Sequence, residues 1–276
     1  MAFESLTVDR YRGALVGLAL GDALGAPYEF KSPPFTVEAV FRRGVFNTAP
    51  GHPTDDSTLA VFAAEAVLED GDWAAAYTRR LVAWMQSGPP DIGNQTSVAA
   101  HRWAAGAAPE PDEGAQGNGS LMAVTPVVLR FAADRDRARS SAADFARLTH
   151  PSDAAASTNA RFADALLDVM AGGEPPTIAE PRRPAYSRQM GWCELCLDLA
   201  FLTWHRSKTL GPLAALVELI ALGGDTDTNA AVAGALLGAT HGMAAWPGDL
   251  VAGLHLAPRL SDLAEQLWQA ATAPER

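Results

Sequence analysis

Glycine recurs at every fourth position of one apolar stretch near the start of the chain. Residues 13–26 read GALVGLALGDALGA, with glycine at positions 13, 17, 21 and 25. Residues four apart lie on the same face of an α-helix, so these glycines form a strip without side chains. A second helix can approach such a strip closely. The stretch therefore predicts a helix buried in the core, packed against a close neighbour.

The same stretch could instead be the apolar core of a signal peptide, because small residues follow it. However, Asp22 interrupts the apolar run, and Glu4 and Asp9 stand where a signal peptide carries positive charge. The run is also too short to cross a bilayer, which takes about 20 apolar residues. We therefore expect a core helix and no membrane contact.

Helical periodicity continues through most of the chain. Apolar residues recur three and four apart after Ser57 and over residues 73–85, whereas β-type alternation is confined to short stretches around 35–46. Turn-forming residues dominate 31–53, 105–119 and a proline-rich connector at 174–184. We expect an all-α fold, a compact multi-helix bundle, as a single domain over residues 1–276. Further helices are expected at residues 7–25, 120–133, 142–149, 153–171, 186–206, 211–221, 226–241, 248–253 and 260–272.

The charge of the chain limits its partners. It carries 32 acidic and 21 basic side chains, a formal net charge of −11 at pH 7, and shows no basic patch. Nucleic-acid backbones and anionic membranes repel such a chain. We expect a cytoplasmic protein, since two cysteines in 276 residues suit a reducing compartment. We also expect a monomer.

The two cysteines, Cys193 and Cys196, are spaced like a redox dithiol or half of a zinc site. No second Cys or His pair stands at ligand spacing, and Met190, Cys193, Leu197 and Trp204 follow one helical stripe. We expect buried thiols with a structural role.

Acidic and hydroxyl side chains gather at two predicted helix starts. TDDST occupies residues 54–58, and GGDTDT occupies residues 223–228 directly before an apolar helix. One such residue suffices as an N-cap, and like charges at close range repel unless a cation or proton compensates. Each cluster alone is also consistent with a well-capped helix and solvated acids. Two similar clusters favour a shared ligand site.

The ligands of such a site would all be oxygen atoms. An all-oxygen set suits hard cations such as Mg²⁺ or Mn²⁺, and four carboxylates suit two of them. We therefore expect two divalent cations. The carboxylates and hydroxyls come from Thr54, Asp55, Asp56, Asp225, Asp227 and Thr228.

Six ordered motifs give the chain a resemblance to a known family. They are GALVGLALGDALGAPYEF at 13–30, TDDST at 54–58, DIGNQT at 91–96, GNGSLM at 117–122, THPSDAA at 149–155 and GGDTDTNAAVAGALLGA at 223–239. Together they resemble the ADP-ribosylglycohydrolase family, the relatives of dinitrogenase reductase activating glycohydrolase and of ADP-ribosylarginine and ADP-ribosylserine hydrolases. The resemblance runs over nearly the whole chain and implies a compact all-α fold with a dinuclear metal cleft.

The resemblance also implies roles for single residues. Both clusters would bind the Mg²⁺ or Mn²⁺ ions, and either Glu29, on a mobile segment, or Asp56 would transfer the proton. GNGSLM would offer backbone N–H groups to a pyrophosphate, although by itself it is equally typical of a plain turn. His150 alone could be a cap or core residue. Substrate contacts are expected from Asp91, Gly117, Asn118, Gly119, Ser120, Met122 and His150.

The implied activity is hydrolysis of the glycosidic bond between ADP-ribose and a protein side chain or small molecule, which reverses mono-ADP-ribosylation. Relatives often carry Arg after GNGSLM, where this chain has Ala123. The phosphate contact or loop packing that this Arg supports in relatives is therefore not expected from the same position here. Two alternatives are a dinuclear-metal phosphoester hydrolase and a non-catalytic ADP-ribose-binding protein. The sequence does not specify the acceptor.

Overall fold

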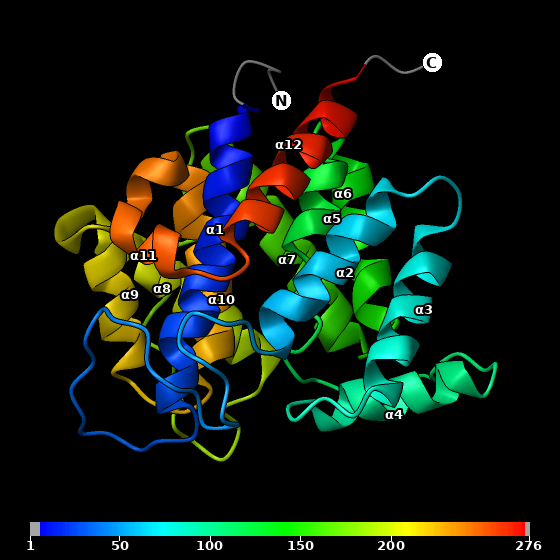
Figure 1. Ribbon diagram of the computed structural model, residues 1–276, viewed down its shortest axis with the longest axis horizontal. Coiled ribbons are helices and arrows are strands. Elements are labelled where there is room, and N and C mark those ends of the chain that lie inside the picture. The colour runs from blue at the N-terminus through cyan, green and yellow to red at the C-terminus, as the bar shows by residue number, and fades with distance from the viewer. Residues whose placement is uncertain (1–5, 274–276) are drawn as a thin grey trace.

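The glycine-rich helix and the helix that follows GGDTDT form a central pair. The computed structural model describes residues 6–273, which fold into helices, turns and loops without a β-strand. Figure 1 shows α1 and α10 side by side, with the other helices around them. The α-helices are α1 (Val8–Gly25), α2 (Asp55–Leu68), α3 (Trp73–Gln86), α4 (Asn94–Ala104), α5 (Thr125–Arg130), α6 (Arg135–Arg147), α7 (Asp153–Met170), α8 (Cys193–Leu210), α9 (Pro212–Ile220), α10 (Thr226–His241), α11 (Gly248–Gly253) and α12 (Ala257–Thr272), with 3₁₀ turns η2 (Ala26–Tyr28) and η3 (Gly242–Ala245).

The glycine strip of α1 lies directly on the backbone of α10. A Cβ at Gly13 would overlap the carbonyl of Gly238, and a Cβ at Gly25 would overlap that of Thr226. These pairs run in opposite directions, so the two helices are antiparallel and the end of α1 meets the start of α10. Backbones can come this close only where side chains are missing. The predicted close-packed core helix is confirmed.

Asp22 ties the start of α2 to this central pair. Its side chain is fully buried on α1 and accepts hydrogen bonds from the N–H of Thr54 at 3.2 Å and from the N–H of Ser57 at 3.1 Å. The hydroxyls of Thr54 and Ser57 also donate to it, the former at 2.8 Å. Asp22 therefore satisfies donors that a helix N-terminus leaves free, and three helix ends converge at one place.

The all-α prediction is confirmed over the described residues, and the expected bounds of α10 and α11 agree with the structure. The prediction missed α4 (Asn94–Ala104), whose sequence NQTSVAAHRWA is mostly polar. Its buried residues Thr96, Ala99 and Ala100 are spaced as on one helix face, and the Trp103 indole donates to the carbonyl of Leu148. That spacing was the available signal.

Other predicted bounds were wrong at one or both ends. The helix expected at 120–133 is reduced to α5 because GNGSLM forms a turn, and α6 begins at Arg135 because Asp134 caps it. Residues 186–192 form turns before α8. The alternation at 35–46 belongs to an extended segment without a partner strand, from which Phe35, Val37 and Phe41 pack on the core.

Cys193 and Cys196 are free and buried in α8, as expected. Within residues 6–273 no helix has the length and apolarity needed to cross a membrane.

We predict that Gly17→Ala destabilises the fold. The added methyl would overlap the Gly234 carbonyl and the Trp246 ring, forcing α1 and α10 apart. Overpacked cores lose about 1–3 kcal/mol, occasionally more, and a backbone contact leaves little room to relax. Urea unfolding should show a lower midpoint. Gly248→Ala is the matched control, since nothing lies near its Cβ position, and it should be neutral or slightly stabilising. Equal midpoints for both variants would contradict the close α1–α10 contact.

Candidate functional site

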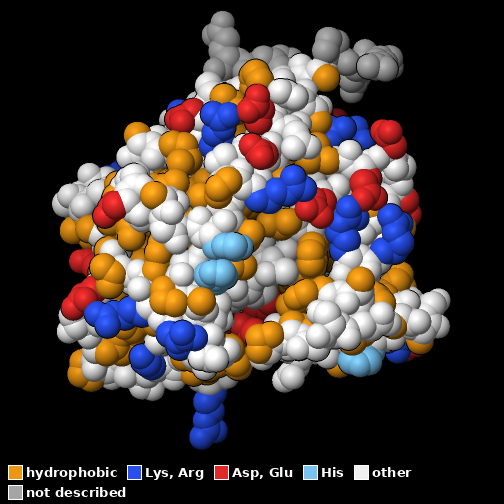
Figure 2. All heavy atoms as spheres, in the orientation of Figure 1, with side chains coloured by type: hydrophobic (Ala, Val, Ile, Leu, Met, Phe, Trp, Pro, Cys, Tyr) orange, Lys and Arg blue, Asp and Glu red, His pale blue; other side chains and the backbone are white. Residues whose placement is uncertain are grey.

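A pocket of about 590 Å³ lies where the ends of α1, α2 and α10 converge. Figure 2 shows acidic side chains on the floor of a hollow in this face of the molecule. The pocket is lined by Glu29, Phe30, Phe46, Asp55, Asp56, Asp91, Ile92, Gly93, Asn94, Gln95, Thr96, Gly117, Asn118, Gly119, Met122, His150, Gly191, Asp225, Asp227 and Thr228.

All but two of the residues predicted from the sequence line this pocket. The exceptions are Thr54 and Ser120, which lie just behind its wall. The Thr54 hydroxyl donates to Asp22 and lies 3.3 Å from Asp56, and the Ser120 hydroxyl accepts a hydrogen bond from Asn159 at 3.0 Å. Segments far apart in the sequence are thus brought together as expected. The individual roles of these residues stay predictions.

The capping interpretation accounts for only part of the TDDST cluster. Thr54 is the N-cap of α2, and its hydroxyl accepts from the N–H of Asp56 at 3.3 Å. Asp55 and Asp56 are not needed for capping, yet both are buried in the first turn. The helix dipole favours their charge by only about 0.3–1 kcal/mol each, which is small against the cost of burying an unpaired carboxylate.

In GGDTDT the capping interpretation fails for Asp225. Asp225 holds the N-cap position of α10, but its side chain caps nothing and instead accepts from the Asn118 amide at 2.8 Å. Asp227 accepts from the N–H of Thr228 at 3.0 Å. The Thr228 hydroxyl lies 3.4 Å from Asp56, so it links the two clusters. The Asp225 carboxylate is therefore turned toward the pocket rather than toward its own helix, whereas Asp227 bonds to the first turn of α10 and also lines the pocket.

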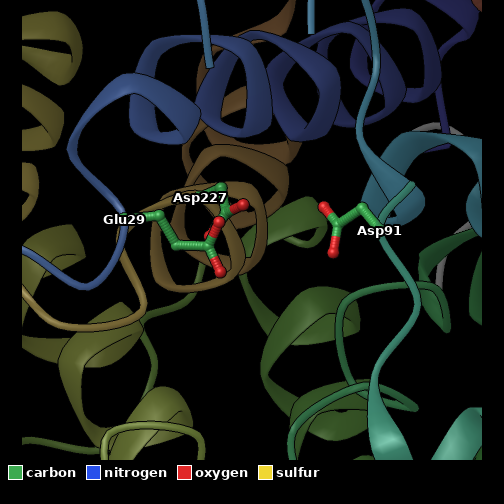
Figure 3. A group of neighbouring side chains, drawn as sticks. All are labelled: Glu29, Asp91 and Asp227. Carbon is green, nitrogen blue, oxygen red and sulfur yellow. The ribbon is translucent and has the colours of Figure 1, made fainter. Parts of the chain in front are cut away.

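Three carboxylates converge from separate elements. Single carboxylate oxygens of Glu29, Asp91 and Asp227 all lie within 4.8 Å of one another, an arrangement that could hold a metal ion. Figure 3 shows Glu29 beside Asp227, with Asp91 pointing toward them from the segment before α4. The resemblance implied that Glu29 can approach a metal or the substrate, whereas Asp91 was expected to contact substrate, so the position of Asp91 so close to Asp227 was not predicted.

The electrostatics of the pocket are dominated by unneutralised acids. Burial, followed by the charges of Asp225 and Asp91, raises the pKa of Glu29 to about 9. Burial is also the main reason why the pKa of Asp91 rises to about 6 and why the pKa values of Asp55, Asp56 and Asp227 are raised well above normal. Among the described residues, no Lys or Arg lines the pocket. The site therefore needs protons or cations as compensation.

Two buried oxygen atoms show that the residues fit a cation. Glu29 Oε2 and Asp56 Oδ1 have no hydrogen-bond partner within residues 6–273. Buried polar atoms are rarely left unpaired, because each costs about 1–3 kcal/mol, more when charged. Together with the converging carboxylates and the hydroxyls of Thr54 and Thr228, they form an all-oxygen donor set of the kind that Mg²⁺ or Mn²⁺ prefers.

GNGSLM forms a turn that packs against His150, and its Asn118 reaches the acidic group by donating to Asp225. The His150 ring lies close to Gly117 and Gly119, where a Cβ at Gly119 would be 3.0 Å from it. Its Nδ1 is 2.8 Å from the Thr149 hydroxyl, and burial lowers its pKa to about 4, so the ring is neutral near pH 7. It can offer the pocket a hydrogen bond but no charge.

Several residues that position or line the site were not among the predicted site residues; they are Asp22, Phe30, Phe46, Ile92, Gly93, Asn94, Gln95, Thr96 and Gly191. Gln95 accepts from the N–H of Gly117 at 2.9 Å, and Asp22 holds the start of α2. Gln95 belongs to DIGNQT and Asp22 to the glycine-rich motif, so both stood within recognised motifs. Phe30 and Phe46 line the pocket from a proline-rich loop that carries no such pattern.

Comparisons with known proteins agree with this geometry. A model of the family described as ADP-ribosylglycohydrolase matches residues 4–180 and 154–276. The chain is 27% identical to ADP-ribosylarginine hydrolase Tri1 of Pseudomonas putida (strain GB-1), covering 96% of this chain and 79% of the relative. It is 28% identical to ADP-ribosyl-[dinitrogen reductase] glycohydrolase of Rhodospirillum rubrum, covering 85% and 86%.

A solved structure described as an ADP-ribosylglycohydrolase-related protein complex has the same fold. It superimposes with a TM-score of 0.81 at 28% identity, covering 96% of this chain and 99% of the other. The matched length and the shared fold agree, and the chain belongs to the ADP-ribosylglycohydrolase family.

Proposed function

We propose that this protein is a hydrolase that releases ADP-ribose from ADP-ribosylated acceptors, a protein side chain or a small molecule, and so reverses mono-ADP-ribosylation. The observation that carries the proposal is the pocket in which six carboxylates from four segments meet without a lining Lys or Arg among the described residues. Family membership and the two relatives named for this kind of hydrolysis support it.

We propose two divalent cations, Mg²⁺ or Mn²⁺, held by the sequence-predicted ligands, with Glu29 and Asp91 close enough to complete the site. Bound there, the ions would supply positive charge for ribose hydroxyls and for an attacking water. The protein supplies rigid positions for the ligands. The ligand set is Thr54, Asp55, Asp56, Asp225, Asp227 and Thr228.

The reaction requires one proton to leave water and one to reach the acceptor. The bond between the anomeric carbon and the acceptor atom breaks, and the water oxygen takes the acceptor's place on that carbon. Glu29 and Asp56 are the two candidates for this transfer because each has a buried oxygen without a protein partner. Such a group gives a proton to the departing acceptor when it is protonated and takes one from water when it is ionised, and the raised pKa of Glu29 favours its protonated form.

We propose that the segment around GNGSLM and His150 binds the ADP side of the substrate. The N–H groups of Gly117 and Asn118 already donate to Gln95 and to the Gly191 carbonyl. The pyrophosphate contact expected there therefore falls to the N–H groups of Gly119 and Ser120, of which Gly119 lies beside the neutral His150 ring. Because the described lining contains no Lys or Arg, phosphate binding relies on backbone dipoles and on bound cations.

We predict that activity on a mono-ADP-ribosylated peptide requires a divalent cation, since the acids otherwise repel one another and cannot hold the water. Incubation with excess EDTA should abolish release of ADP-ribose, and added Mg²⁺ or Mn²⁺ should restore it. Chromatography that separates ADP-ribose from phosphate also distinguishes a phosphoester hydrolase. Undiminished release from metal-free protein in excess EDTA would exclude the cation proposal.

We predict that Asp225→Asn and Asp227→Asn each lower metal affinity at least about a hundredfold. Loss of a residue that only orients a metal ligand lowers affinity by up to about a hundredfold, and loss of a ligand itself should cost at least as much. Each amide oxygen can keep the existing hydrogen bond, from Asn118 or from the Thr228 N–H. Without metal, both variants should therefore be as stable as wild type or slightly more so, because repulsion is relieved.

The matched control for these variants is Asp72→Asn. Asp72 is an aspartate that does cap its helix, accepting from the N–H groups of Ala74 and Ala75. Asn caps as well as Asp does, so this change should alter stability by a few tenths of a kcal/mol and leave metal binding intact. Calorimetric titration with Mn²⁺ gives the affinities. If Asp225→Asn and Asp227→Asn both bind Mn²⁺ with wild-type affinity, the acids of GGDTDT are structural and not metal ligands.

We predict that free ADP-ribose raises the melting temperature in the presence of Mg²⁺. A ligand that binds only the folded state stabilises by about 2.7 kcal/mol at a hundredfold excess over Kd. Asp91→Ala and His150→Ala should reduce the shift, because both side chains line the pocket. A shift without any metal-dependent release would favour the non-catalytic binding protein. If millimolar ADP-ribose leaves the wild-type melting temperature unchanged, the ligand assignment is wrong.

A further inference from the structure

Basic side chains gather on two segments that border the pocket. The sequence by itself shows no basic patch, because these segments, residues 31–53 between η2 and α2 and residues 181–192 between α7 and α8, are far apart in the chain. Their only acidic residue is Glu38, although the whole chain has a net charge of −11. Figure 2 shows Lys and Arg side chains beside the acidic hollow, over the loop between η2 and α2. We call the exposed bases of these segments the basic surface: Lys31, Arg42, Arg43, Arg182, Arg183 and Arg188.

The two segments meet at the glycines of GGDTDT. A Cβ at Gly223 would overlap the carbonyl of Lys31, and a Cβ at Gly224 would overlap that of Ala185. Consecutive residues at the entry to α10 therefore pack against one segment and then the other. Each segment also contributes to the lining of the pocket. The basic surface is thus continuous with the edge of the pocket.

The bases of this surface are short of acidic partners within residues 6–273. Only Arg42 forms an ion pair there, with Glu38. In the rest of the described chain, every Lys or Arg pairs with an acid except Arg10, Arg130 and Arg137. Arg10 and Arg130 donate to backbone carbonyls instead, and Arg137 covers an aromatic ring. An acidic protein therefore keeps most of its exposed, unpaired bases on one surface.

Aromatic rings hold two of these bases in place. The Lys31 ammonium lies 5.1 Å from the centre of the Tyr28 ring, and the Arg183 guanidinium lies 4.8 Å from that of Trp192. Such contacts order a long side chain while its polar head stays accessible. Less conformational entropy is then lost when a partner binds.

Large apolar side chains are exposed among the bases. In the described chain, most exposed side chains of this kind lie on the two segments or directly beside them, and only Val98 and Leu210 lie elsewhere. Arginine together with exposed aromatic and aliphatic side chains is typical of protein–protein interfaces. A nucleic-acid backbone would pair with the bases but gain little from the aliphatic groups. The apolar residues are Phe30, Val40, Val45, Phe46 and Tyr186.

The basic surface lies outside the pocket, since none of its six residues is among the lining residues. An ADP-ribosyl group inside the pocket therefore leaves these bases free. They can contact the part of a larger substrate that remains outside, around the modified residue.

We propose that the basic surface docks the stretch of protein chain that flanks the modified residue, and that this stretch is acidic with apolar side chains among its acids. This inference rests on the proposed glycohydrolase function, and it holds whichever residue carries the ADP-ribose. Complementary charge gives specificity and faster association. Because salt screens charges beyond about 8 Å, the surface attracts acids locally despite the net charge of the chain.

The test uses mono-ADP-ribosylated peptides in two linkages, through arginine and through serine. Each is made with Glu and Leu flanks or with Gln and Leu flanks. Wild-type protein should have a higher kcat/KM for the Glu/Leu peptide than for its Gln/Leu twin, chiefly through a lower KM. The advantage should shrink between about 50 and about 300 mM NaCl, because salt screens exposed charges.

Arg182→Gln combined with Arg188→Gln should lower kcat/KM for the Glu/Leu peptide by roughly two- to thirtyfold, the range for two exposed ion pairs, and leave the Gln/Leu peptide unchanged. Arg79→Gln combined with Arg139→Gln is the matched control. It alters the net charge equally, on α3 and α6, and should leave both peptides unchanged. The melting shift caused by free ADP-ribose should be the same in both double variants.

The apolar part of the surface is tested with Tyr186→Ala. This variant should lower kcat/KM for the Glu/Leu peptide but not for a peptide with Ser in place of Leu. Leu210→Ala is the control, because Leu210 is similarly exposed, 41% against 48% for Tyr186, but lies at the end of α8. It should leave both peptides unchanged.

Equal wild-type kinetics on the Glu/Leu and Gln/Leu peptides would overturn the inference, and so would equal losses in the two double variants. A single-stranded DNA oligomer that binds more tightly than the Glu/Leu peptide, and loses affinity in the Arg182→Gln/Arg188→Gln variant, would assign the surface to nucleic acid and also overturn it.

If wild-type protein releases no ADP-ribose from any peptide, the proposed function fails. Fluorescence anisotropy with a labelled, unmodified Glu/Leu peptide then decides docking separately. Weaker binding by the Arg182→Gln/Arg188→Gln variant than by wild type would support the docking surface, and equal affinities would reject it.

Discussion

The backbone contact between α1 and α10 is the constraint on which the site depends. Because four glycines of α1 face carbonyls of α10 over about three helical turns, the two helices have a fixed register and direction. The end of α1 must then meet the start of α10. Two ordinary apolar helices can shift sideways, because their side chains change rotamers. Here backbone atoms are in contact and cannot repack, so α1 and α10 cannot shift in this way. The positions of Glu29 and Asp225 follow from this contact.

Asp22 extends the same constraint to a third helix. It lies on the strip-bearing helix one residue after Gly21, and it accepts four hydrogen bonds from the start of α2. These bonds offset the cost of burying its carboxyl, although burial still raises its pKa. Asp55 and Asp56 are therefore placed by a contact between helices rather than by the loop that precedes them. This rigidity allows the fold to keep like charges together, because the helices cannot move apart to relieve the repulsion.

Sequence reasoning found the site better than it found the helices around it. Clustered acids at helix starts are visible in the chain because their number exceeds what capping uses, and glycine spacing shows which helices must touch. In contrast, α4 was missed because most of its residues are polar and hide the apolar spacing. The helix expected at 120–133 was too long, because GNGSLM ends in residues that also occur in helices. The turn depends on contacts with His150 and Gln95, which come from other segments. Such tertiary contacts leave no periodic signal in the sequence.

Asp72 and Asp225 show that the local sequence does not determine what an N-cap aspartate binds. Both are aspartates at the N-cap position of an α-helix, yet Asp72 accepts from its own helix and Asp225 accepts from Asn118. Both are preceded by a glycine with positive φ, Gly71 at +100° and Gly224 at +85°, so the difference comes from tertiary contacts. A Cβ at Gly224 would overlap the carbonyl of Ala185, whereas nothing lies near the Cβ position of Gly71, so only the entry to α10 is packed against another segment. Asp225 has a ψ near 77° rather than the extended value usual for an N-cap. Its carboxylate is directed away from the helix. The packing of Gly224 against Ala185 and the hydrogen bond from Asn118 thus accompany the turn of Asp225 toward the pocket, and the Gly224 carbonyl accepts from the N–H of Phe30 at the edge of that pocket.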